Sequence, residues 1–165
     1  MEKLYLDCDG VILDTINAGS KIIKEKNIKT EEEVRSFYQN LCWEKLINEA
    51  GEIDNSIAKI KDLMQSYDIS ILTHVISKSE EIAKKNYFQK VLPQIEVIPV
   101  PKEINKADYV NPINNILVDD FMPNLEYWYK KGGIPIKFSD SGKKCKYRSI
   151  KDLKELSKKD SGMIK

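Results

Sequence analysis

The sequence predicts an α/β domain of the doubly wound class, in which a parallel sheet carries helices on both faces. Short runs of apolar and β-branched residues recur along the chain, and several lack the polar alternation of a half-exposed strand. Helical patterns fill the intervals between these runs, as a parallel sheet requires. A length of 165 residues suits one domain with one well-buried core.

The predicted strands are four to six residues long. They lie at 4–7 (LYLD), 69–73 (ISILT), 95–100 (IEVIPV), 115–119 (NILVD) and 134–138 (IPIKF). Continuous apolar strands of this kind are typical of a sheet buried on both faces.

The first strong helix signal begins at Thr30. Glu33 follows it at the spacing of a capping box, in which the hydroxyl and the carboxylate each satisfy a free backbone N–H. Apolar residues then recur at helical spacing, which predicts one helix over about 31–49.

Two further helices follow the second and fourth strands. Ser77 or Ser79 can cap a helix over 80–92, and Pro123 suits the first turn of a helix over 124–131. Gly132 and Gly133 follow the second of these helices and are expected to end it.

The interval between the first two strands is longer than a crossover needs. The two runs are about 60 residues apart, whereas a crossover takes only a dozen or so. We therefore expect a small helical cap over residues 17–55, inserted into a core domain formed by 1–16 and 56–165.

The composition excludes several classes of protein. The chain is 41% hydrophobic and 32% charged with a net charge of +1, which argues against a disordered polyelectrolyte and against a nucleic-acid binder. Its three cysteines are widely scattered, which suits a reducing cytoplasm better than a disulfide framework or a thiolate metal site. The sequence has no apolar stretch of about 18 residues. We therefore expect a cytoplasmic protein that does not insert into membranes.

Residues 137–165 carry ten Lys or Arg against four Asp or Glu. A docking face for a polyanion is one interpretation, and a solvated terminal helix over 149–158 is the other. The second is favoured, because only Tyr147 places an aromatic ring among these charges, whereas a stacking surface for nucleic acid needs several.

Acidic and polar residues end the predicted strands. Asp7 and Asp9 follow the first strand, Thr73 ends the second, and Asp119 and Asp120 end the fourth. Ligands of an open α/β sheet bind beyond the carboxyl ends of its strands. Because close carboxylates repel each other, a hard cation such as Mg²⁺ is expected among them.

In this order the motifs resemble those of the haloacid dehalogenase-like (HAD) phosphohydrolases. The motifs are D-x-D-G-V from Asp7, the sequence ILT ending at Thr73, a lysine, and VDD ending at Asp120. D-x-D alone is common by chance, whereas the ordered set is specific. Response-regulator receivers use similar residues on a similar sheet, but there the acid pair comes first.

The resemblance implies the Rossmann-like HAD fold and a two-step phosphoryl transfer. Asp7 would be the nucleophile that forms an aspartyl phosphate, and Asp9 the general acid and base. Acting as an acid would require a site that raises the pKa of Asp9. Thr73 and a lysine would hold the phosphoryl oxygens, and Lys106 fits the lysine motif better than Lys102.

The same resemblance implies a Mg²⁺ cofactor. Its ligands would be Asp7, Asp119 or Asp120, and the backbone carbonyl of Asp9. Each acid also has an ordinary explanation, since Asp9-Gly10 can form a turn and Asp119-Asp120 can cap the next helix. Those explanations leave the order of the motifs unaccounted for.

Other residues near the motifs are assigned on weaker grounds. His74, the single histidine, adjoins Thr73 and is expected to line the substrate site or to be structural. Cys8 lies between the two acids and is expected to face the core. From the cap, Phe37, Tyr38 and Trp43 could stack a substrate base, and Trp43 is the best candidate for such a contact. Phe37, Tyr38 and Leu41 at helical spacing are more simply explained as the cap core.

The stretch from Val97 to Asp120, followed by a Trp-bearing helix and GGIPIKF, looks like the small bacterial and phage nucleotidases related to deoxyribonucleotidases. The expected partner is therefore a small phosphorylated metabolite, preferably a nucleoside monophosphate. Sugar phosphates and polynucleotide ends are the alternatives within the family. A non-catalytic phosphate-binding module that kept the fold is the alternative outside it.

Overall fold

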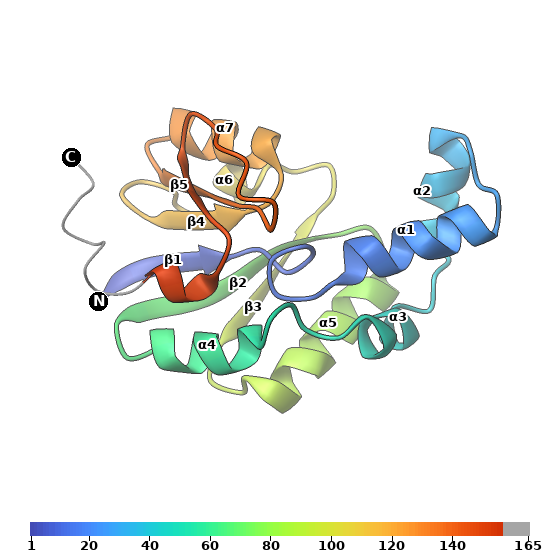
Figure 1. Ribbon diagram of the computed structural model, residues 1–165, viewed down its shortest axis with the longest axis horizontal. Helices are drawn as coiled ribbons and strands as arrows, with labels where there is room; N and C mark the ends of the chain where they lie inside the picture. Colours follow the sequence, from blue (N-terminus) through green and yellow to red (C-terminus); the bar gives the residue numbers. More distant parts are fainter. Residues whose placement is uncertain (157–165) are drawn as a thin grey trace.

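A computed structural model describes residues 1–156 of the chain (Figure 1). The strands are β1 (Glu2–Leu6), β2 (Tyr67–Val75), β3 (Glu96–Pro101), β4 (Ile116–Asp119), β5 (Ile134–Phe138) and β6 (Arg148–Ile150). The α-helices are α1 (Thr15–Glu25), α2 (Glu31–Gln39), α3 (Trp43–Ala50), α4 (Ser56–Leu63), α5 (Lys78–Val91), α6 (Lys106–Tyr109) and α7 (Met122–Lys130). A short 3₁₀ helix, η1, spans Leu153–Leu156.

The six strands form one sheet in the order β3-β2-β1-β4-β5-β6, and every neighbouring pair is parallel. This confirms the predicted doubly wound α/β fold. The chain builds outward from β1 through β2 to β3, then returns to the other side of β1 with β4. The order of the strands therefore reverses beside β1, which is where open α/β sheets bind ligands.

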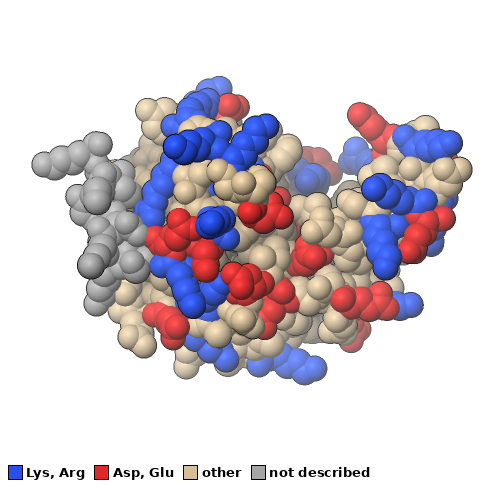
Figure 2. Space-filling model, viewed as in Figure 1, with Lys and Arg blue, Asp and Glu red and all other residues tan. Residues whose placement is uncertain are grey.

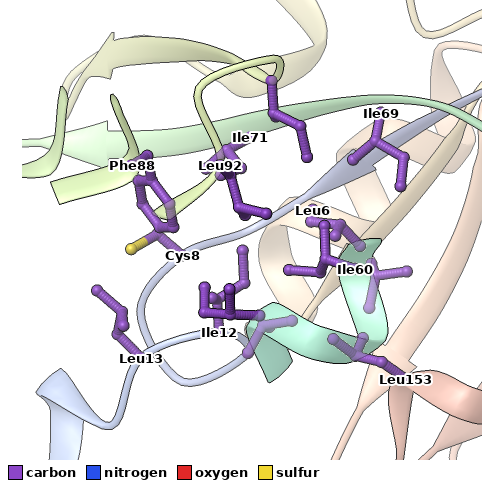
Figure 3. Close-up of a cluster of buried hydrophobic side chains, with 14 of the residues drawn as sticks. Leu6, Cys8, Ile12, Leu13, Ile60, Ile69, Ile71, Phe88, Leu92 and Leu153 are labelled. Carbon is purple, nitrogen blue, oxygen red and sulfur yellow. The ribbon is translucent and has the colours of Figure 1, made fainter. Parts of the chain in front are cut away.

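Alternate residues of the strands pack into two apolar cores, one on each face of the sheet. Leu4 and Leu6 face a larger core under α4, α5 and η1, whereas Tyr5 faces a smaller one with Trp128 of α7. Figure 1 shows α4 and α5 on one face of the sheet and α6 and α7 on the other. The larger core is drawn in Figure 3, where Cys8 lies among apolar side chains including Phe88.

Helices α1, α2 and α3 lie beside the sheet and not on either face (Figure 1). They occupy nearly the range 17–55 predicted for a cap, although α1 already begins at Thr15. The capping box of Thr30 and Glu33 is formed as expected. The division into a cap and a core domain stays a prediction.

The single helix predicted over 31–49 is wrong, because the chain breaks at residues 40–42 and forms α2 and α3. The break lets α3 turn so that Trp43, Leu46 and Ile47 are buried. Trp43 fixes the corner, since its indole N–H donates to the backbone oxygen of Tyr38 at 3.0 Å. Burial of this apolar face outweighs the helical propensity of an uninterrupted run.

The helices after β2 and β4 form as predicted. Ser77, not Ser79, caps α5, and its side chain accepts the backbone N–H of Glu80 at 3.1 Å. Pro123 lies in the first turn of α7, and Gly132 follows that helix at a φ of 86°.

The terminal helix predicted over 149–158 is wrong within the described residues. Residues 148–150 form β6, which pairs with β5, and η1 follows. Ile150, Leu153 and Leu156 are buried in the larger core, so this segment adds an edge strand and covers the sheet. Residues 157–158 of that prediction lie outside the described part of the chain.

Charges of both signs are interspersed over the face seen in Figure 2, with Lys and Arg most frequent along its upper edge. Near the end of the described chain, Lys146 pairs with Glu126 at 2.9 Å. None of the helices in residues 1–156 is long and apolar enough to cross a lipid bilayer.

Candidate active site

The chain leaves β1 at Asp7 and turns sharply. The Asp7 backbone N–H still donates to Val118 of β4 at 2.9 Å, so the residue is fixed by the central strands. The backbone N–H groups of Ile12 and Leu13 donate to the carbonyl of Cys8, which closes a compact loop. Gly10 supplies the turn with a φ of 78°.

Three carboxylates meet at the carboxyl ends of β1 and β4. One oxygen each from Asp7, Asp119 and Asp120 lies within 4.8 Å of the other two. Asp7 and Asp119 are buried, and Asp120 is partly exposed. These oxygens are the ligand type that Mg²⁺ and other hard cations prefer, so the donor set fits the expected cofactor.

Lys106 balances part of this charge. Its buried ammonium donates to Asp7 Oδ1 and Asp119 Oδ2, both at 2.7 Å. Asp119 also accepts the Asn124 side-chain amide at 2.9 Å and the Phe121 backbone N–H at 2.8 Å. Of the two lysines considered from the sequence, Lys106 therefore lies at the acids, whereas Lys102 is exposed and lines the adjoining cavity.

Burial and the negative charge that Lys106 does not offset shift the pKa values of these acids. Burial, opposed by Lys106 and reinforced by Asp119, raises the pKa of Asp7 well above its usual range. Burial and the neighbouring Asp119 raise the pKa of Asp120 to about 6. Both shifts follow from crowding acids in a poorly solvated place, and a bound cation would relieve them.

Asp9 lies in a second cluster beside the first. Thr15 donates its hydroxyl to Asp9 Oδ1 at 2.6 Å, and Lys84 donates its ammonium to Asp9 Oδ2 at 2.6 Å. The same ammonium contacts Thr73 Oγ1 at 2.9 Å and Glu80 Oε1 at 2.6 Å. Asp9, Thr73 and Glu80 thus converge on one buried lysine.

The expectation of a raised pKa at Asp9 is wrong for this structure. Burial of the carboxyl would raise its pKa, but the charge and hydrogen bond of Lys84, together with the Thr15 hydroxyl, hold the pKa below the ordinary value. Asp9 is therefore an ionised carboxylate in the resting site.

A cavity of about 270 Å³ opens next to both clusters. The helices α1, α2 and α3 contribute Ile16, Tyr38 and Trp43 to its walls. The rings of Tyr38 and Trp43 stack with centroids 5.8 Å apart and planes inclined by 26°. On the side of the sheet, the cavity is lined by Asp7, Asp9, Asp120 and His74, among others.

The other residues singled out from the sequence have these places. His74 lines the cavity, and its Nε2 is 2.8 Å from the Ile104 backbone oxygen. Trp43, the best candidate for a substrate contact, lines it together with Tyr38. Cys8 is fully buried in the larger core, and burial raises the pKa of its thiol well above the usual range.

Lys84, Glu80 and Thr15 were not anticipated. Glu80 and Lys84 are four residues apart on a predicted helix, a spacing that is usually a solvated ion pair. Thr15 stands beyond the D-x-D-G-V motif, at the start of α1. The cap at Ser77 was the signal in the sequence that could have indicated Glu80. It starts α5 directly after β2, so the first turn of this helix lies next to the carboxyl end of the sheet.

Many solved structures share this fold. A HAD-hydrolase of Bacillus subtilis bound to magnesium superimposes with a TM-score of 0.68 at 14% identity, over 94% of this chain and 96% of that one. A HAD phosphatase of Thermococcus onnurineus gives a TM-score of 0.62 at 16% identity, over 98% of each chain. This chain has the HAD fold.

A HAD-superfamily hydrolase of subfamily IA from Geobacter sulfurreducens is also similar, with a TM-score of 0.64, 13% identity, and coverage of 94% of this chain and 97% of that one. No protein-family model matches the sequence, and no curated protein matches it. At these identities the similarity establishes the HAD fold and leaves the activity to be argued from the site.

Proposed function

We propose that this HAD-fold chain is a Mg²⁺-dependent phosphomonoester hydrolase that acts through an aspartyl phosphate on Asp7. The observation that carries the proposal is the meeting of Asp7 with Asp119 and Asp120, whose oxygens lie within 4.8 Å, beside a cavity that Asp9 also lines. A nucleophile, a proton carrier and a cation site are therefore within reach of one substrate.

In the first step, Asp7 Oδ2 attacks phosphorus, since Oδ1 accepts a hydrogen bond from Lys106. The bond from Oδ2 to phosphorus forms as the bond from phosphorus to the ester oxygen breaks, and Asp9 gives a proton to the leaving alkoxide. Asp9 must take up that proton beforehand. The negative charge of an incoming phosphate favours this uptake, because a like charge raises the pKa of a carboxyl.

In the second step, Asp9 accepts a proton from water, which attacks the aspartyl phosphate and releases inorganic phosphate and the free Asp7 carboxylate. Lys106 and the Thr73 hydroxyl are assigned to the phosphoryl oxygens. A Mg²⁺ ion held by the carboxylates supplies positive charge that offsets the charge on those oxygens.

Asp120 is the better direct ligand of the two neighbouring acids. Both oxygens of Asp119 already accept hydrogen bonds, from Phe121, Lys106 and Asn124. Asp120 is partly exposed and lines the cavity, and it is not engaged by Lys106. We therefore assign Asp7 and Asp120 to the ion and Asp119 to the orientation of Lys106.

We further propose a nucleoside monophosphate as the preferred substrate. The stacked rings of Tyr38 and Trp43 offer an apolar wall that suits a base, and exposed Phe121 adds to it. A cavity of about 270 Å³ lies at the small end of ligand pockets, which favours a single nucleotide over a polymer end.

The test is phosphate release from a panel of nucleoside monophosphates, sugar phosphates, a 5′-phosphorylated oligonucleotide and an aryl phosphate, with and without Mg²⁺. Mg²⁺-dependent release that is fastest with nucleotides is the expected result. Release that is fastest with another class refutes the substrate and keeps the chemistry. Absence of release from every ester by folded, Mg²⁺-loaded protein would favour the non-catalytic phosphate-binding module.

A further inference from the structure

Lys84 is a fully buried cation next to the proposed reaction centre, and the chemistry above gives it no role. Its ammonium lies within 3.0 Å of four acceptors, namely Asp9 Oδ2, Glu80 Oε1, Thr73 Oγ1 and the His74 backbone oxygen. An ammonium has three N–H groups. With four acceptors around it, every N–H group of Lys84 is used and at least one is shared between two acceptors.

The neighbourhood of Lys84 is itself held in place. Glu80 accepts the Ile76 backbone N–H at 2.7 Å while pairing with Lys84, which ties the first turn of α5 to the end of β2. On the opposite side, the Lys84 ammonium lies 5.5 Å from the centre of the Trp43 ring. Lys84 therefore spans from the sheet to the cavity wall built by α3.

This arrangement constrains Asp9, which lines the cavity, and Thr73, which is assigned to the phosphate. Asp9 accepts Thr15 on one oxygen and Lys84 on the other, which fixes the plane of its carboxylate. Because an ammonium can only donate, the oxygen of Thr73 must be the acceptor in its contact with Lys84. The Thr73 hydroxyl hydrogen is then available to donate, and its present acceptor, the His74 carbonyl, is 3.3 Å away.

We propose that Lys84 is a positioning residue for phosphoryl transfer: it orients the Asp9 carboxylate toward the leaving oxygen and makes the Thr73 hydroxyl a donor to the phosphate. This inference rests on the proposed function. Small errors in such positions matter, since a displacement of about 1 Å can cost roughly 100-fold in rate.

The competing explanation is that Lys84 only neutralises buried acids. A second lysine gives a matched control, because Lys59 on α4 is also buried and pairs with two acids, Asp54 at 2.6 Å and Asp152 at 2.9 Å, away from the cavity. Lys59→Met removes a buried lysine with two acidic partners, which are more exposed than those of Lys84, without touching Asp9 or Thr73.

The experiment measures kcat and KM of Lys84→Met and Lys59→Met with the best substrate of the panel, and the unfolding free energy of both. We expect kcat of Lys84→Met to fall about 100-fold and its KM to rise by up to about tenfold, because the Thr73 hydroxyl is no longer held as a donor to the phosphate, and we expect both constants of Lys59→Met to be unchanged. If the unpaired Glu80 prevents folding of Lys84→Met, the double variant Glu80→Gln/Lys84→Met replaces it with the same expectation. Wild-type kcat in the folded variant overturns the proposal, and so does an equal loss in Lys59→Met.

A second readout separates this inference from the proposed function. Inorganic phosphate is titrated calorimetrically into Mg²⁺-loaded wild type and the same variants. If the wild type hydrolyses nothing, the proposed function fails. The inference about Lys84 can still be tested, because it requires the Lys84 variant to bind phosphate about tenfold more weakly than the wild type and Lys59→Met do. Equal binding by all three proteins overturns it, as does the absence of binding to the wild type.

Discussion

Substitution of Gly10 by alanine should separate the stability of the fold from the chemistry of the site. Gly10 has a φ of 78°, a conformation that costs an L-residue about 1–2 kcal/mol. The new Cβ would also meet the Asp120 carboxylate, 2.9 Å from its Cγ, and Ile16 Cδ1 at 2.8 Å. Carbon atoms pack at roughly 3.5–4.0 Å, so Asp120 must retreat by roughly 1 Å.

We expect this retreat to disturb the meeting of Asp120 with Asp7 and Asp119, whose oxygens lie within 4.8 Å of one another. Because Asp120 is partly exposed, it can swing outward, and we expect the clash to add only about 1 kcal/mol to the backbone cost. The functional loss should be larger, about 100-fold in kcat/KM together with a higher Mg²⁺ requirement, since a displacement of about 1 Å is enough for that.

The assays are urea unfolding and phosphate release as a function of Mg²⁺ concentration. Gly142→Ala is the control, since Gly142 has a φ of 63° and an added Cβ would meet nothing within 4 Å. It should lose about 1 kcal/mol and no activity. If Gly10→Ala kept the turnover and the Mg²⁺ requirement of the wild type, Asp120 would not be the ligand that we assign.

Three further predictions concern single residues. Asp7→Asn should abolish turnover, measured as phosphate release. It should not lower the unfolding free energy at neutral pH, measured by urea unfolding, because a neutral amide replaces a buried carboxyl whose pKa is raised by burial and by neighbouring acids. Chelation of Mg²⁺ should stop phosphate release, and Asp120→Asn should need at least about tenfold more Mg²⁺ than Asp119→Asn for half-maximal binding in calorimetry. Burial lowers the pKa of His74 below 6.5, so the unfolded state binds this proton more readily, and the contribution of His74 to the unfolding free energy should decline as pH falls from 6.5 toward the folded pKa. The single imidazole can be titrated by NMR, and the difference in unfolding free energy between the wild type and His74→Gln should show this decline; a midpoint at or above 6.5 would contradict the assignment.

The sequence was most informative where an apolar strand stops at a polar residue. Asp7 follows β1, Asp119 ends β4, and Thr73 lies in β2 two residues before its end at Val75. Parallel strands bring their carboxyl ends to one edge, so the convergence of these residues could be predicted without coordinates. Lys106 was predicted by its place before the last acidic strand. It lies 2.7 Å from both Asp7 and Asp119.

Contacts between helices and the sheet could not be predicted in the same way. Glu80 and Lys84 look alike whether they face water or a buried acid, because helical spacing fixes which residues share a face and not what that face meets. The lowered pKa of Asp9 depends on Lys84, so it could not be foreseen either. The break at 40–42 arises from burial of Trp43, a tertiary effect that outweighs local propensity.

The proposed nucleophile, Asp7, follows β1 in the interior of the sheet, and this position affects how the substrate range of the protein could change. β1 is flanked by β2 and β4, so the three strands that carry Asp7, Thr73 and Asp119 are contiguous and lie away from both edges of the sheet. Their backbone amides should be the slowest to exchange with deuterium, because opening them requires global unfolding. The cavity walls supplied by α1, α2 and α3 lie outside this block. Replacing α2 and α3 by a different helical segment should therefore alter which molecules are accepted, while Asp7, Asp9 and Thr15 are kept.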